Sequence, residues 1–206
     1  MSAAAQPALP VRRQAEVVRD TAETHVRVSL GIDGTGEHRV RTGVGFLDHM
    51  LAQTALHGLF DLVVEAAGDL EVDAHHTVED VALALGEAFR QALGDRWGIV
   101  RMGFSAVPMD DSLAEVAVDL SGRPYAVFQA AWHNPSVGEL PTSLVEHFFE
   151  SFAAAARCNL HARVIYGKDD HHQAEALFKA FGRALDAASQ LDPRRAGRVP
   201  STKGVL

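Results

Sequence analysis

The hydrophobic positions along the chain follow two periods, one typical of strands and one typical of helices. β-Branched residues at alternate positions predict strands, and apolar residues three and four positions apart predict helices. Gly58 and Gly94 follow the two helices of the first half and are expected to cap them. The patterns there predict strands at Val17–Val18, Val26–Leu30 and Leu62–Ala66, and helices at Phe46–His57 and Thr77–Leu93.

The same order of elements returns in the second half of the chain. Its strands are predicted at Val100–Val107, Leu113–Leu120, Tyr125–Ala131 and Leu160–Tyr166, and its helices at Thr142–Cys158 and His171–Ser189. The second half therefore consists of three strands, a helix, a strand and a helix. In the first half, the turn at 31–36 indicates a further strand before the first helix, so each half is interpreted as a βββαβα unit.

Chemically distinctive residues recur at matching places in these two units. His49 is matched 98 residues later by His147, and the pair His75-His76 is matched 96 residues later by the pair His171-His172. The register continues without gaps, so that Gly86 corresponds to Gly182 and Ala88 to Ala184. We interpret the chain as an internal duplication, which favours an α+β fold of two similar halves, each with a sheet backed by helices.

The ends of the chain differ in composition from the repeated units. We expect an Ala/Pro-rich, disordered tail at 1–11, half-repeats at 12–97 and 98–190, and a C-terminal tail at 191–206. The first ten residues lack the basic residues and the apolar core of a signal peptide. No apolar run approaches the roughly 20 residues that span a bilayer, so no membrane partner is expected.

Composition and charge exclude several functional classes. With 47% hydrophobic and 22% charged residues, the chain is neither disordered nor collagen-like. Its single cysteine, Cys158, excludes an internal disulfide and a four-thiolate zinc site, and favours a reducing, cytoplasmic setting. A net charge of -8 argues against nucleic acid as a partner.

Histidine is enriched, and its placement suggests metal binding. Each half carries one histidine on its first helix and a His-His-x-x-Glu sequence at the start of the next, ending in Glu79 or Glu175. One such histidine is usually structural, but two copies in register favour ligands. Adjacent histidines diverge by about 100° on a helix, so His75 and His76 suit different partners. Six imidazoles and two carboxylates would serve two ions with three histidines and one glutamate each; such donors fit Mn, Fe, Co, Ni or Zn.

A second group of residues has the chemistry that binds a phosphate monoester. Arginine, lysine, a hydroxyl and a backbone amide beside glycine form charged hydrogen bonds to phosphate oxygens. The candidates are Arg101, Arg123, Lys179, Ser201 and Lys203. The pair Arg194-Arg195 is instead interpreted as a solvated basic turn.

Five segments carry a more specific signal. They read Phe-Leu-Asp-His-Met-Leu at 46–51, Asp-Ala-His-His-Thr-Val-Glu-Asp at 73–80, Asp-Leu-Ser-Gly-Arg-Pro at 119–124, Glu-His-Phe-Phe at 146–149 and Pro-Ser-Thr-Lys-Gly-Val-Leu at 200–206. In this order they resemble the imidazoleglycerol-phosphate dehydratase family of histidine biosynthesis. The resemblance covers about Arg12 to Leu206, which leaves no room for a fused phosphatase domain and implies a monofunctional form.

The resemblance implies a structure, an assembly and a ligand set. The expected fold has a four-stranded sheet in each half with the helices packed between the two sheets. The expected assembly is a 24-mer with two Mn²⁺ per active site, held between subunits. The implied ligands are His49, His75, His76, Glu79, His147, His171, His172 and Glu175. Glu23 and Gln53 match positions that contact the substrate, and Arg101, Arg123, Lys179, Ser201 and Lys203 match the phosphate-binding set. Lys168–Asp170 departs from the family pattern, which should alter helix capping rather than ligation.

The implied reaction is the dehydration of D-erythro-imidazole-glycerol phosphate to imidazole-acetol phosphate. Metal coordination would make an imidazolate accessible, the C3 hydroxyl would leave through a diazafulvene-like intermediate, and Glu23 would remove the C2 proton as general base. Two alternatives remain open: a dinuclear phosphate-ester hydrolase, which usually needs bridging Asp ligands, and a metal-storage assembly, which needs no phosphate-binding residues.

Overall fold

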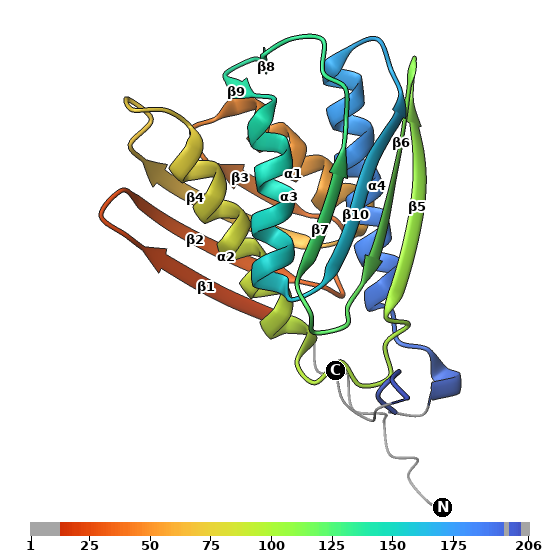
Figure 1. Cartoon of the computed structure of the whole chain (residues 1–206). Coiled ribbons are helices and arrows are strands. Elements are labelled where there is room, and N and C mark those ends of the chain that lie inside the picture. Colours follow the sequence, from red (N-terminus) through yellow and green to blue (C-terminus); the bar gives the residue numbers. More distant parts are fainter. Residues whose placement is uncertain (1–12, 196–197, 203–206) are drawn as a thin grey trace, which may run out of the picture.

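The computed structural model describes residues 13–195 and 198–202, which form two sheets with a layer of helices between them (Figure 1). The first sheet has the strand order β1-β2-β4-β3. Its strands are β1 (Gln14–Asp20), β2 (Thr24–Gly31), β3 (His38–Arg41) and β4 (Asp61–Gly68). β1, β2 and β4 pair antiparallel, and β3 pairs parallel to β4.

The second sheet has the equivalent order, β5-β6-β10-β7. Its strands are β5 (Met102–Met109), β6 (Ser112–Asp119), β7 (Tyr125–Gln129) and β10 (Asn159–Tyr166). β7 pairs parallel to β10, as β3 does to β4. The predicted duplication of a βββαβα half and the two four-stranded sheets are thereby confirmed. A small hairpin of β8 (Ser136–Val137) and β9 (Leu140–Pro141) was not predicted, since two-residue strands leave no periodic pattern.

Four helices fill the space between the sheets. They are α1 (Gly45–Gly58), α2 (His75–Leu93), α3 (Ser143–Ala156) and α4 (Asp170–Ser189), and a 3-10 turn follows at Pro193–Arg195. α1 packs against α4 and α2 packs against α3, so each helix pair joins one half of the chain to the other. In Figure 1, α2 and α3 run side by side between the two sheets.

Equivalent glycines allow these helix pairs to approach closely. A Cβ atom at Gly86 would lie 2.7 Å from the carbonyl oxygen of Phe152 on α3, and one at Gly182 would lie 2.4 Å from that of Thr54 on α1. Gly58 also belongs to the α1–α4 contact and lies inside the helix, so the expectation that it caps α1 was wrong. Leu59 takes the left-handed cap conformation instead, with φ of 56°.

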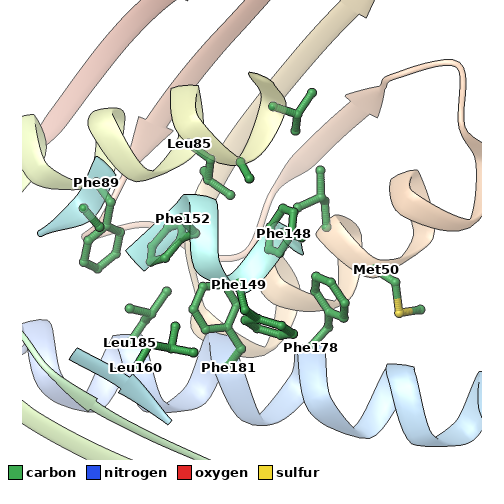
Figure 2. Packing of buried hydrophobic residues seen from close by; sticks show 14 of the residues in the cluster. Met50, Leu85, Phe89, Phe148, Phe149, Phe152, Leu160, Phe178, Phe181 and Leu185 are labelled. Carbon is green, nitrogen blue, oxygen red and sulfur yellow. The ribbon is translucent and has the colours of Figure 1, made fainter. Parts of the chain in front are cut away.

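Phenylalanine side chains fill the centre of the helical layer (Figure 2). Phe148, Phe149 and Phe152 of α3 meet Phe178 and Phe181 of α4, all fully buried. Ring centroids lie 5.0 Å apart for Phe149 and Phe178 and 4.8 Å apart for Phe152 and Phe181. This packing holds the two helices of the second half together, and Phe89 of α2, whose ring centroid lies 6.0 Å from that of Phe152, links them to the first half.

The ends of the chain lie partly outside the described residues. The predicted tail at 1–11 lies there entirely, and so does Lys203 of the predicted C-terminal tail. The division at residues 97 and 98 falls between α2 and β5.

Cys158 is buried, which raises its pKa to about 12. Among the described helices, none is long and apolar enough to cross a membrane.

Candidate metal centre

One group of metal-binding side chains combines the first helix of one half with the last helix of the other. His49 lies on α1, and His171 and Glu175 lie on α4. The Nε2 atoms of His49 and His171 are each 3.2 Å from Oε2 of Glu175, and the two imidazole centroids are 5.4 Å apart. Three donor atoms therefore converge on one point between α1 and α4.

A second group repeats this arrangement between the other two helices. His75 and Glu79 lie on α2, and His147 lies on α3. Nε2 of His147 is 3.8 Å from Oε1 of Glu79, and the ring centroids of His75 and His147 are 4.6 Å apart. Each group thus takes its single histidine from one half of the chain and its His-x-x-x-Glu pair from the other.

The donor atoms of both groups fit a divalent cation. Two ligands at right angles, each about 2.1 Å from an ion, lie about 3 Å apart, close to the spacing around Glu175. Nε2 of His147 is buried without a hydrogen-bond partner among the described residues, which is costly for a polar atom unless a ligand binds it. Imidazole and carboxylate without thiolate suit borderline transition metals. Each group holds two histidines and one glutamate, one histidine fewer than the sequence arithmetic suggested.

The remaining two histidines point away from these groups. Nδ1 of His76 lies 3.2 and 3.1 Å from the two carboxylate oxygens of Asp69, and Nδ1 of His172 lies 2.6 Å from Oδ1 of Asp111. Hydrogen bonds to these carboxylates raise the pKa of both imidazoles. The predicted divergence of the adjacent histidines therefore separates His76 and His172 from the ions that their neighbours would bind.

Glu175 is held by a cation as well as by histidines. Nζ of Lys179 lies 2.6 Å from Oε1 of Glu175, one helical turn away on α4, and both side chains are largely buried. Burial opposes ionisation of Glu175, but hydrogen bonds from Lys179 and His49 outweigh it, so the pKa of this carboxyl group is lowered. Glu175 therefore presents a charged Oε2 to the site at neutral pH, while Lys179 occupies its other oxygen.

The ligands gather at one end of the molecule because each lies in the first turns of its helix. Asp73 and Asp169 stand at equivalent positions, and each accepts a hydrogen bond from the backbone N–H of the histidine two residues later, both at 2.7 Å. Asp169 is the N-cap of α4 and accepts the backbone N–H groups of His171 and His172. Both His-His segments therefore start a helix.

The structure places the two predicted substrate-contacting residues at the same end. Glu23 lies in the turn between β1 and β2, with Oε2 3.7 Å from Nδ1 of His76 and its side chain 53% exposed. Gln53 follows His49 by one turn on α1. Glu23 is exposed enough to meet a substrate, and it lies beside the second histidine of the first half.

Most of the predicted phosphate-binding set lies near the C-terminal end of α4, away from the two histidine groups. Arg101 donates its backbone N–H to the carbonyl oxygen of Ala188 in the last turn of α4, at 2.8 Å. Thirteen residues separate Glu175 from Ala188, which at 1.5 Å per residue is about 20 Å. Arg101, Arg123 and Ser201 line an open pocket of about 750 Å³, together with Arg194, Arg195 and Arg198. Only Lys179 of the described set accompanies the metal ligands, and Lys203 lies outside the described residues.

Arg101 connects the C-terminal segment to the second sheet. Its guanidinium makes two hydrogen bonds to Asp119, of 2.7 and 3.0 Å, and a third to the carbonyl oxygen of Pro200 at 2.7 Å. Ser201 follows directly, so the segment approaches the arginine pocket through this contact. Arg194 is largely exposed and pairs with Asp192, but it also lines the pocket that contains Arg101, so the pair Arg194-Arg195 is more than a solvated basic turn.

The structure adds Asp69 and Asp111 to the residues identified from the sequence. Asp69 stands in the loop before α2, whereas Asp111 stands in the turn between β5 and β6, and neither is within four residues of its histidine. Spacing could not reveal these contacts. For Asp111 the sequence did carry one signal: a carboxylate residue directly precedes the second strand of each half, Glu23 before β2 and Asp111 before β6.

Comparisons with known proteins give matches to a single family. The profile of the family described as imidazoleglycerol-phosphate dehydratase matches residues 42–185. The enzyme of that name from Chloroflexus aggregans is 59% identical over 98% of both chains, and the one from Chloroflexus aurantiacus is 60% identical over 94% of this chain and 95% of its own. Two solved structures have the same fold. The Staphylococcus aureus enzyme is 37% identical with a TM-score of 0.79, over 87% of this chain and 99% of its own. The Pyrococcus furiosus protein is 35% identical with a TM-score of 0.80, over 92% and 100%.

One assignment follows from the duplicated fold, from the relatives that match nearly the full chain, and from the two histidine groups, each of which combines residues of both halves. The chain belongs to the imidazoleglycerol-phosphate dehydratase family and is a hydro-lyase of the dehydration step in histidine biosynthesis.

Proposed function

We propose that this hydro-lyase is a metal-dependent enzyme with two Mn²⁺ per active site, which converts D-erythro-imidazole-glycerol phosphate to imidazole-acetol phosphate. The observation that supports this most strongly is the pair of crossed ligand groups, His49 with His171 and Glu175, and His75 with Glu79 and His147. Ions with open positions would lower the cost of an anionic imidazole ring and polarise the departing hydroxyl.

Glu23 is the general base in this proposal. Its carboxylate is half exposed and lies beside His76, at the end of the molecule that carries the ligands. Once the C3 hydroxyl has left to give a diazafulvene-like species, Glu23 would take the proton from C2, and the enol would tautomerise to the ketone. Gln53 would orient the substrate from α1. Lys179 keeps Glu175 ionised, and in this proposal it would also attract an anionic substrate.

The active site in this proposal is completed by other subunits of a 24-mer. A separation of about 20 Å along α4 prevents Arg101 and Glu175 of one chain from holding the same small substrate. Arg101, Arg123, Ser201 and Lys203 of one subunit would therefore bind the phosphate of a substrate whose imidazole ring lies near another subunit's ligands. His76 and His172 point away from their own chain's groups, which supports the same arrangement for the metals.

The test compares products and metal dependence in one experiment. The purified enzyme, stripped with a chelator and reloaded with Mn²⁺, is given imidazole-glycerol phosphate, and both ketone and inorganic phosphate are measured. Ketone formation that requires Mn²⁺ supports the proposal. Phosphate release without ketone would identify the hydrolase alternative, and bound metal with no turnover would favour metal storage.

The C-terminal segment gives a further expected result. Deleting residues 201–206 should raise KM about tenfold or more, because charged hydrogen bonds to the phosphate, each of about 1.5–3 kcal/mol, are lost. Some kcat should be lost as well, since phosphate binding helps to orient the imidazole ring. Steady-state kinetics of the truncated and the full-length enzyme measures both changes. Unchanged KM and kcat would remove the substrate-closing role of the 191–206 tail.

A further inference from the structure

His76 and His172, which point away from the two metal-binding groups, are held by carboxylates in different ways. Oδ1 of Asp111 accepts a hydrogen bond from Nδ1 of His172 at 2.6 Å. Oδ2 of the same carboxylate accepts the backbone N–H groups of Lys168 and Asp169, at 2.6 and 3.2 Å. Each carboxylate oxygen of Asp111 therefore has its own hydrogen-bond donors, and the carboxylate cannot rotate without losing the two backbone N–H groups.

Asp69 lacks such a constraint. Its two carboxylate oxygens share Nδ1 of His76, at 3.2 and 3.1 Å, and no other hydrogen bond reaches this side chain within the described residues. The carboxylate can therefore rotate without losing a second donor. His76 and His172 occupy equivalent places in the duplication, but only the second has a partner of fixed orientation.

We propose that Asp111 is a positioning residue that fixes the tautomer of His172, so that Nδ1 carries the proton and Nε2 is left as the metal-binding atom. A neutral imidazole has one protonated nitrogen, and a nitrogen that carries a proton cannot bind a metal. Nε2 of His172 makes no hydrogen bond among the described residues; its nearest carboxylate, on Asp110, is 3.6 Å away, beyond hydrogen-bond distance. This inference rests on the proposed metal-dependent function.

An asparagine at position 111 would reverse the tautomer. The backbone N–H groups of Lys168 and Asp169 require an oxygen, so the carbonyl of the amide must face them. The NH₂ group is then left facing His172, where it donates to Nδ1 and forces the proton onto Nε2. At position 69 the amide is free to turn its oxygen toward His76, so the same change leaves that tautomer intact.

The experiment titrates chelator-stripped enzyme with Mn²⁺ and follows the free ion by its electron paramagnetic resonance signal. In Asp111→Asn, one of two Mn²⁺ sites per chain should weaken by about 10- to 100-fold, the usual effect of losing a ligand's hydrogen-bond partner. Asp69→Asn and the exposed control Asp33→Asn should bind two ions as the unaltered enzyme does.

A third variant separates positioning from a merely structural role. Asp111→Ala leaves the two backbone N–H groups unpaired and should lower the melting temperature more than Asp111→Asn does. It leaves either tautomer open to His172, so it should bind Mn²⁺ better than Asp111→Asn. The opposite order of Mn²⁺ affinities, or unchanged affinity in Asp111→Asn, would overturn the inference. If the unaltered enzyme binds no Mn²⁺, the proposed function itself fails, which is a distinguishable result.

Discussion

If the chain binds two Mn²⁺ ions as proposed, a variant with both His49→Ala and Glu175→Gln is expected to keep one ion, whereas His49→Ala combined with Glu79→Gln is expected to lose both. The reason is the crossing of the ligand groups. His49 and Glu175 serve one ion, so the second substitution removes nothing further, while Glu79 serves the other ion. Removing either ion should lower kcat at least about a thousandfold, because metal assistance is worth several kcal/mol.

Metal content measured by elemental analysis, together with steady-state kinetics, checks this result. Circular dichroism confirms that each doubly substituted chain is folded. If each ion took its ligands from one half of the chain, the result would be reversed: His49→Ala with Glu79→Gln would keep one ion, and His49→Ala with Glu175→Gln would lose both. His133→Ala is the matched control and should keep both ions and full activity. Its imidazole is 53% exposed, and the backbone N–H groups of His133 and Asn134 still bind Asp170.

In the proposed Mn²⁺-dependent 24-mer, chelation of the ions at neutral pH is expected to reduce the assembly to a much smaller particle. His76 and His172 lie outside the groups formed by their own chain, so an ion that uses them joins subunits. A ligand that binds the assembled state and not the separated chains stabilises the assembly by mass action. Adding Mn²⁺ back should restore the large particle.

Sedimentation velocity measures this change directly. His76→Ala and His172→Ala should give the smaller particle without a chelator, and each should lose at least about a thousandfold in kcat, as expected when a metal site is broken. His133→Ala again serves as the control and should stay assembled. An intact 24-mer that contains no metal would show that the ions do not hold the subunits together.

The helical spacing in the sequence was sufficient to predict which faces the candidate ligands occupy. A helix repeats every 3.6 residues, so the positions of His171 and Glu175 four residues apart already place them on one face. The same periodicity required His172 to diverge from His171. The matching register of Gly86 and Gly182 revealed the duplication, because equivalent residues in the two halves meet equivalent packing demands.

Which helices face each other was decided only by the tertiary structure. The contact of α1 with α4 depends on the close approach of Gly182 to the carbonyl oxygen of Thr54, a residue more than a hundred positions away in the chain. For this reason the sequence indicated three histidines and one glutamate for each ion, whereas one chain brings together two histidines and one glutamate.

The sequence determined which residue types are present and what local face each occupies, because helix and strand periods are properties of neighbouring residues. Only the tertiary structure decided that His49 joins Glu175 rather than Glu79, that Asp111 holds His172, and that Arg101 lies at the far end of α4. Such distances are set by the packing of sheets on helices, to which residues far apart in the chain contribute jointly.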